Sequence, residues 1–126
     1  MTRSAIHGAA CRMGRALLAA CLARPGLTLA AALEHVGHPA LGGDAGLLAG
    51  QGNAGVVLTD AARMTGQDFD VLVDFTRPDA TVRALAACRQ AGRAMVIGTT
   101  SLDDAGRASI AAAGTDIPLV WAPNMS

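Results

Sequence analysis

The chain has 126 residues, with ten basic and ten acidic side chains and therefore zero formal net charge. A balanced charge argues against a nucleic-acid partner, and no apolar run is long enough to span a membrane. The hydrophobic fraction of 52% suffices for the core of a single domain. Three widely spaced cysteines, Cys11, Cys21 and Cys88, form no disulfide framework, which favours reduced thiols in the cytoplasm.

The first segments alternate between strand-like and helix-like patterns. A short apolar run over 4–7 predicts a strand, and Gly8 breaks it. Apolar residues at helical spacing predict a helix over 12–23, which Pro25 and the glycine after it stop. A second strand is expected over 27–33, and Glu34 stands at its end.

A glycine-rich segment separates this unit from the next. Residues 35–55 contain seven glycines and predict a long loop with one helical turn near 45–49. A third strand is expected over 56–59. Asp60 then caps a short helix that runs through Met64.

The remaining segments continue the alternation. We expect strands over 71–75, 94–97 and 119–122. One helix is expected to begin at Pro78 and end at Gly92. Another is expected to be capped by Ser101 and to end at Gly114. This order predicts an α/β fold, a Rossmann-type doubly wound and mostly parallel sheet of about six strands, arranged 3-2-1-4-5-6. Residues 1–126 would form one dinucleotide-binding domain.

The first strand–helix turn has the pattern of a pyrophosphate-binding turn. Gly8 and Gly14 occupy the first and third glycine positions of that pattern, and Ala10 occupies the central one. Glu34 follows about twenty residues later, where an acid accepts hydrogen bonds from the adenosine ribose. A tight turn without a ligand remains the alternative reading of the turn alone, but the combined pattern favours a nucleotide.

Other polar residues follow the later strands. The segments 74–78, 98–100 and 122–126 lie where ligands bind to open parallel sheets. Thr76 and Ser101 could equally be helix caps.

The sequence favours structural rather than metal-binding or redox roles for the histidines and Cys11. His7, His35 and His38 are not at metal-ligand spacing and are expected to face different segments, so no metal site is predicted. His7 lies in a core strand and is expected to be a packing histidine whose polar atoms are satisfied. Cys11 could be a redox thiol at a helix N-terminus, but filling of the turn by a small residue is favoured.

Several stretches together resemble a known family. They are Gly8-Ala9, Arg12–Arg15, Ala31–Glu34, Gly43–Gly46, Asp70–Pro78, Cys88–Gly92, Val96–Thr100 and Ala122–Ser126. Over essentially the whole chain the sequence resembles 4-hydroxy-tetrahydrodipicolinate reductase (dihydrodipicolinate reductase) of bacterial lysine and diaminopimelate synthesis. It departs from that family at Ala10-Cys11, where glycine is usual, and at His35, where arginine is frequent.

The resemblance implies a binding site for NADH or NADPH. The residues expected to contact the cofactor are Gly8, Ala9, Ala10, Cys11, Arg12 and Met13 at the pyrophosphate, Glu34 and His35 at the adenosine ribose, and Phe75, Thr76, Gly98, Thr99, Thr100, Ala122, Pro123, Asn124 and Met125 at the nicotinamide half. A hydride from NAD(P)H would give tetrahydrodipicolinate.

The family's substrate domain would follow Ser126. It carries a His-His-x-x-Lys motif, and this chain has no lysine. We therefore expect residues 1–126 to hold no catalytic residue and to be inactive alone, with the substrate and the homotetramer contacts belonging mainly to the missing domain. A free-standing NAD(P)(H) sensor module is the alternative. A related aspartate or homoserine dehydrogenase is a third reading, which Val96–Thr100 and Phe75–Pro78 disfavour.

Overall fold

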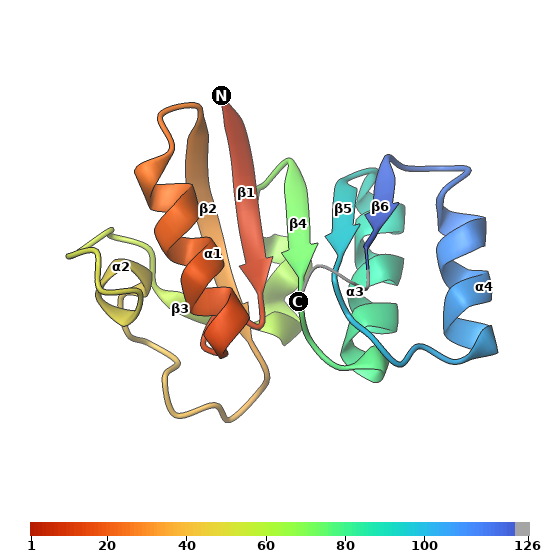
Figure 1. The fold of residues 1–126 in the computed structure, drawn as a ribbon, viewed down its shortest axis with the longest axis horizontal. Helices are drawn as coiled ribbons and strands as arrows, with labels where there is room; N and C mark the ends of the chain where they lie inside the picture. Colours follow the sequence, from red (N-terminus) through yellow and green to blue (C-terminus); the bar gives the residue numbers. More distant parts are fainter. Residues whose placement is uncertain (123–126) are drawn as a thin grey trace.

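Six parallel strands form one sheet in the computed structural model, which describes residues 1–122. The strands are β1 (Thr2–His7), β2 (Leu27–Glu34), β3 (Leu58–Asp60), β4 (Val71–Asp74), β5 (Ala94–Ile97) and β6 (Leu119–Trp121). Their order is β3-β2-β1-β4-β5-β6, and every neighbouring pair is parallel. The arrowheads of β1, β4, β5 and β6 accordingly point the same way (Figure 1). The Rossmann-type fold and the strand order predicted from the sequence are confirmed.

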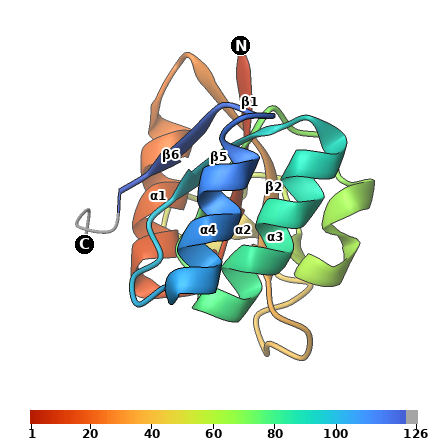
Figure 2. The ribbon, with the colours of Figure 1, turned by 90° about the vertical axis from the view of Figure 1, so that its right-hand side faces the viewer.

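Helices cover both faces of this sheet. They are α1 (Arg12–Ala23), α2 (Ala45–Leu48), the 3-10 helix η1 (Ala61–Gly66), α3 (Pro78–Ala91) and α4 (Asp104–Ala113). The helices α1 and α2 pack on one face, and η1, α3 and α4 lie on the other (Figures 1 and 2). Across residues 1–122, none of these helices combines the length and apolar character needed to cross a bilayer.

Two buried clusters make up the core, one on each face. Along β1, Ala5 faces the α3 side and Ile6 faces the α1 side, as the period of two requires. On α3, Ala84, Leu85 and Cys88 form one buried stripe at helical spacing. Burial raises the pKa of the Cys88 thiol to about 11, which keeps it protonated at neutral pH.

The glycine-rich segment is ordered around one carboxylate. Asp44 caps α2 by accepting a hydrogen bond from the Leu47 amide at 3.0 Å. Its two oxygens also accept from the amides of Ala54 and Gly55, each at 2.8 Å. The Ala54 bond, supported by those of the other amides, holds the pKa of Asp44 below its ordinary value. The predicted helical turn near 45–49 is confirmed as α2.

Two boundary predictions were wrong. β3 begins at Leu58 because the Val56 carbonyl bonds instead to the Ala45 amide in the preceding loop. Asp103, rather than Ser101, caps α4 by accepting from the Gly106 amide at 2.8 Å. Ser101 adopts a left-handed φ of 63°, which places it in the turn before the helix.

The caps of the other two helices are as follows. Asp60 caps η1 by accepting from the Ala62 amide at 2.8 Å, as predicted. Pro78 begins α3, also as predicted, but the residue before the helix makes no side-chain capping bond. Thr76 bonds instead to Asp74, so its alternative reading as a cap is wrong.

One part of the sheet has no helix over it among residues 1–122. On the α1 side of β4, β5 and β6, the side chains of Val71, Val73, Val96 and Val120 are only partly buried. Val120 is the most open of them, at 55% exposed. The apolar face of the sheet therefore extends past the edge of α1.

Gly14 is the position where the fold leaves no room for a side chain. A Cβ there would lie 2.0 Å from the Gly8 carbonyl oxygen, a backbone atom that cannot move aside. We expect Gly14→Ala to lower the free energy of unfolding by at least about 2–3 kcal/mol through overpacking. Urea unfolding measures this change. A Cβ at Gly26 meets nothing within 4 Å, so Gly26→Ala should stay within about 0.5 kcal/mol of the parent. Equal stability of both variants would contradict the close approach.

Candidate functional site

A cavity of about 570 Å³ opens at the carboxyl ends of β1, β2 and β4. Its lining residues are His7, Gly8, Cys11, Glu34, His35, Phe75, Thr76, Arg77, Asp79, Ala80 and Arg83. The cavity lies where the fold class predicts a ligand, at the point where the strand order reverses between β1 and β4.

Hydrogen bonds to β2 hold the turn after β1. The amides of Gly8 and Ala9 both donate to the Leu33 carbonyl, at 2.9 and 3.1 Å. The Ala10 amide donates to Glu34 Oε2 at 3.0 Å. Ala9 and Ala10 are consequently buried behind the turn, while Gly8, with φ +82°, lines the cavity.

The helix that follows the turn begins with free amides. Cys11 is the N-cap of α1, and its Sγ accepts from the Gly14 amide at 3.3 Å. Arg12 and Met13 are the first two helical residues, so their amides have no acceptor within the helix. These amides and the positive end of the helix dipole favour an anion at this position.

Glu34 has a structural role that its position in the sequence does not indicate. Glu34 is buried, with only 7% of the residue exposed. Besides the bond from Ala10, its Oε1 accepts from the amide of His35 at 3.1 Å. A carboxylate offers about four acceptor positions, so each oxygen keeps one for a ligand. Glu34 also lines the cavity.

A buried chain of polar side chains runs beneath the cavity. His7 Nδ1 lies 3.2 Å from Asp74 Oδ1, and that oxygen also accepts from the amide and hydroxyl of Thr76, at 3.1 and 2.7 Å. The Thr76 hydroxyl lies 3.3 Å from that of Thr81, which is 2.6 Å from the Thr99 hydroxyl. Within the described residues, His7 Nδ1 and Asp74 Oδ2 have no well-aligned hydrogen-bond partner. His7 is buried, as expected of a packing histidine, but the prediction that its polar atoms are satisfied is wrong for Nδ1 within the described residues. His7 also lines the cavity.

The predicted nicotinamide residues occupy different environments. Phe75 and Thr76 line the cavity, and Gly98 packs on Phe75, whose ring would lie 2.1 Å from an added Cβ. Thr99 is buried in the hydroxyl chain, whereas Thr100 is exposed. Ala122 is half-buried after β6. The predictions for Pro123, Asn124 and Met125 lie outside the described residues.

Besides His7, four cavity residues were not among the predicted cofactor contacts. They are Arg77, Asp79, Ala80 and Arg83, at the start of α3. Their position directly after β4 was the available signal, because the first turn of that helix must border the strand ends. Arg83 and Asp79 form an exposed ion pair at 3.5 Å.

The histidines also differ from the prediction. His35 and His38 were expected to face different segments, but their ring centroids lie 5.0 Å apart. Ligand atoms of Glu34, His35 and His38 lie within 4.8 Å of one another. The prediction that the histidines are not at ligand spacing is wrong for this pair, because a tight turn brings the two rings together.

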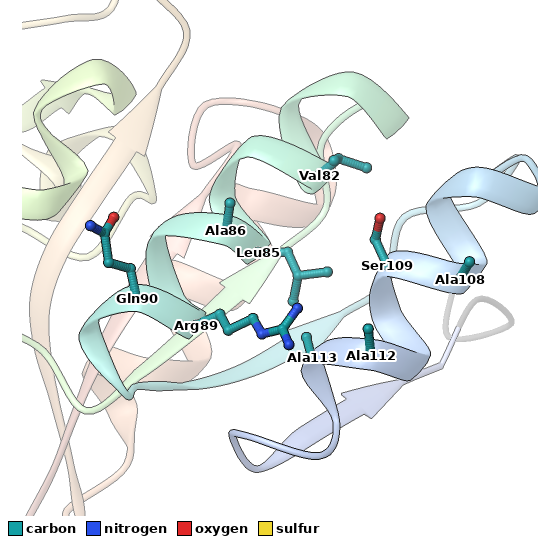
Figure 3. Close-up of a pocket in the computed structure, with 9 residues that line it drawn as sticks. All are labelled: Val82, Leu85, Ala86, Arg89, Gln90, Ala108, Ser109, Ala112 and Ala113. Carbon is teal, nitrogen blue, oxygen red and sulfur yellow. The ribbon is translucent and has the colours of Figure 1, made fainter.

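Two further concave regions lie near α3. An apolar cavity of about 500 Å³ shares His7, His35, Ala80 and Arg83 with the first and continues towards η1. A groove of about 530 Å³ separates α3 from α4, and the Arg89 side chain lies across it (Figure 3). Arg89 is paired with Asp116 at 2.5 Å. The groove otherwise presents mainly alanine and other small or apolar side chains, so it offers little for catalysis.

Comparison with known proteins places this geometry in a family. Residues 2–125 match the family model described as dihydrodipicolinate reductase, N-terminus. The fold is similar to dipicolinate-bound dihydrodipicolinate reductase from Paenisporosarcina sp. TG-14, with a TM-score of 0.74 and 24% identity over 98% of this chain. That match covers 48% of the other protein, so this chain spans about half the length of the reductase.

Other oxidoreductase structures share the fold at lower identity. A protein named as a myo-inositol dehydrogenase from Sinorhizobium meliloti 1021 has a TM-score of 0.70 and 19% identity, over 97% of this chain and 36% of its own. Aspartate semialdehyde dehydrogenase with NADP from Candida albicans has a TM-score of 0.62 and 13% identity, over 79% and 30%. These likenesses show the fold, whereas the family model matches nearly the whole sequence. The chain therefore belongs to the dihydrodipicolinate reductase N-terminal family.

Proposed function

We propose that this chain binds NADH or NADPH as the nucleotide half of a dihydrodipicolinate reductase, which forms tetrahydrodipicolinate in lysine and diaminopimelate biosynthesis. The observation that carries the proposal is the arrangement at the ends of β1 and β2. There the turn at Gly8 and the carboxylate of Glu34 border one cavity, beside the N-terminus of α1. This is the arrangement that a dinucleotide pyrophosphate and its ribose require.

The turn fits a pyrophosphate despite its departure from the family pattern. Ala10 stands where glycine is usual, but Ala10 is buried and does not line the cavity. Its methyl group therefore leaves the approach to the free amides of Arg12 and Met13 open. Cys11 does line the cavity, and it would lie against the phosphates.

The adenosine half would lie over β2 and α3. Glu34 has acceptor positions left for the ribose hydroxyls, and His35 is beside it. The adjoining apolar cavity, lined in part by Ala80, Ala84 and Ala87, has small side chains suited to a flat base. Arg83 borders both cavities, and its guanidinium could stack on that base.

The nicotinamide half would lie near β4 and β5. Bound NAD(P)H would supply the hydride. This chain would orient the ring through Phe75, Thr76 and the exposed Thr100. The sequence contains no lysine and no adjacent histidine pair, so we propose that the proton donor and the groups that bind the substrate carboxylates come from outside residues 1–126. Residues 1–126 alone would then bind cofactor without oxidising it.

Protection of Cys11 tests the cofactor site directly. Cys11 is exposed and lines the cavity, whereas Cys21 and Cys88 are buried and burial raises the pKa of both thiols. Iodoacetamide at pH 8 should therefore modify Cys11 first, and saturating NADH should slow that reaction several-fold. Mass spectrometry of the modified peptides measures both rates. An unchanged rate at saturating NADH would place the cofactor elsewhere.

Replacement of Glu34 should weaken cofactor binding. The Glu34→Ala variant loses the acceptor for the ribose, and a hydrogen bond to a charged group contributes about 1.5–3 kcal/mol. Titration of NADH by fluorescence should show a loss of at least about tenfold. The same variant should also unfold more easily, because the Ala10 amide loses its acceptor.

Asp60 provides the matched control for Glu34. It stands opposite Glu34 in the β2–β3 register, and it also accepts a bond from a backbone amide, but it does not line the cavity. Asp60→Ala should reduce stability without changing NADH affinity. Equal loss of NADH affinity in both variants would mean that Glu34→Ala weakens binding only by destabilising the fold.

The preference between cofactors should follow the charge at the end of β2. The carboxylate of Glu34 would repel a 2′-phosphate, so we expect NADH to bind at least as tightly as NADPH. Parallel titrations of the two cofactors with EDTA present measure this ratio. A strong NADPH preference would point instead to Arg12 or Arg77 as the phosphate anchor.

A further inference from the structure

A tight turn brings two imidazoles together at the end of β2. The His38 amide donates to the His35 carbonyl at 3.1 Å, which closes a four-residue turn. Gly37 has φ +83° at the third position of this turn, as a type II turn requires. The rings of His35 and His38 meet edge to face, with an interplanar angle of 68° and centroids 5.0 Å apart.

A rigid carboxylate completes the cluster. Glu34 is buried, and backbone amides of the β1 turn and of His35 hold its two oxygens in place. Each oxygen retains an acceptor position. Ligand atoms from Glu34, His35 and His38 lie within 4.8 Å of one another, so small side-chain rotations would bring all three onto one ion.

The hydrogen bonds of the two rings indicate which ring nitrogen can bind a metal ion. His35 Nδ1 lies 3.0 Å from the Val36 carbonyl, which can only accept, so this nitrogen carries the proton and Nε2 keeps its lone pair. A ring that donates its other N–H to a carbonyl is the usual state of a metal-binding histidine. His38 Nδ1 accepts from the Ala40 amide at 3.0 Å. Ligation through His38 Nε2 would move its proton to Nδ1 and release that amide to water.

We propose that Glu34, His35 and His38 form a binding site for a divalent transition-metal ion such as Zn²⁺ or Co²⁺. Two imidazoles and one carboxylate suit these ions better than Mg²⁺ or Ca²⁺, which prefer oxygen ligands. Three protein ligands leave a coordination position open to water. This site does not depend on the proposed function. Its ligands come from the end of β2, which carries Glu34, and from the turn after it, which carries His35 and His38.

The metal site would share Glu34 with the proposed ribose site. A metal ion on Glu34 would withdraw the acceptor positions that the ribose hydroxyls need. Metal and dinucleotide therefore compete, and this consequence alone rests on the proposed function.

Cobalt titration of the tag-free chain tests the site. Co²⁺ bound by imidazole and carboxylate should give visible d–d absorption without the intense near-ultraviolet band of a thiolate ligand, and Zn²⁺ should abolish the signal. His35→Asn and His38→Asn each preserve the contact made by Nδ1 and remove Nε2. Loss of even a second-shell partner of a metal ligand costs 10–100-fold in affinity, so either variant should bind roughly 100-fold more weakly. Circular dichroism of the metal-free variants verifies that they are folded.

Cys11→Ser is the matched control, because Cys11 is the exposed thiol of this chain and also borders the cavity. It should bind Co²⁺ as the parent does. The proposal would be overturned by a thiolate band that disappears in Cys11→Ser, by parent-like affinity in either histidine variant, or by absence of binding to the parent chain.

A second titration addresses the shared carboxylate. NADH should bind the zinc-loaded chain more weakly than the metal-free chain. NADH affinity that zinc leaves unchanged would overturn the shared use of Glu34. Failure of NADH to bind the metal-free chain would refute the proposed function, while the cobalt result would still stand or fall by itself.

Discussion

The close approach of α1 to the turn after β1 is the constraint on which the strand ends depend. The Gly8 carbonyl oxygen packs against Gly14, in the space that a Cβ would occupy in any other residue. This contact lets the turn lie low enough for two of its amides to reach the Leu33 carbonyl and a third to reach Glu34. The N-terminus of α1 and the acid at the end of β2 are therefore positioned by the same packing contact. The two halves of the candidate site form as one unit.

On the other side of β1, the strand ends are joined by buried polar side chains. Asp74 is fully buried, and the bonds from Thr76 compensate part of the cost of placing a carboxylate there. The hydroxyl chain then connects β4 through α3 to Thr99 after β5. Buried networks of this kind stabilise one arrangement when their members are satisfied. Thr99 is accordingly fixed within this network, whereas Thr100 is exposed.

Much of the fold could be predicted from the sequence because its signals are local. The apolar period of α1, the proline that opens α3 and the glycine that ends it each report on backbone that the chain builds from neighbouring residues. The boundary of β3 could not be read this way. Val56 looks like a strand residue, but its carbonyl pairs with Ala45 in a loop whose course the sequence pattern does not reveal.

The site was predictable in its residue types but less so in their partners. Spacing alone identified Glu34 as a ligand candidate, yet its bond to the Ala10 amide joins residues 24 apart and depends on the packing of α1. The histidine pair shows the reverse case. His-Val-Gly-His carries a local signal, since glycine at the third position favours a type II turn that brings its first and fourth residues together. A search by ligand spacing along the chain overlooks that geometry.

The two edges of the sheet bear on how this chain behaves beside other chains. Within residues 1–122, β3 and β6 are the edge strands of the sheet, and each has only three residues. A short edge presents few unpaired amides and carbonyls, so it is a poor template for the addition of a foreign strand. Aggregation by strand pairing is thereby disfavoured at both sides of the sheet. Contact through the valines beside α1 is then the more accessible route to self-association, and it would be driven by apolar burial rather than by backbone hydrogen bonds.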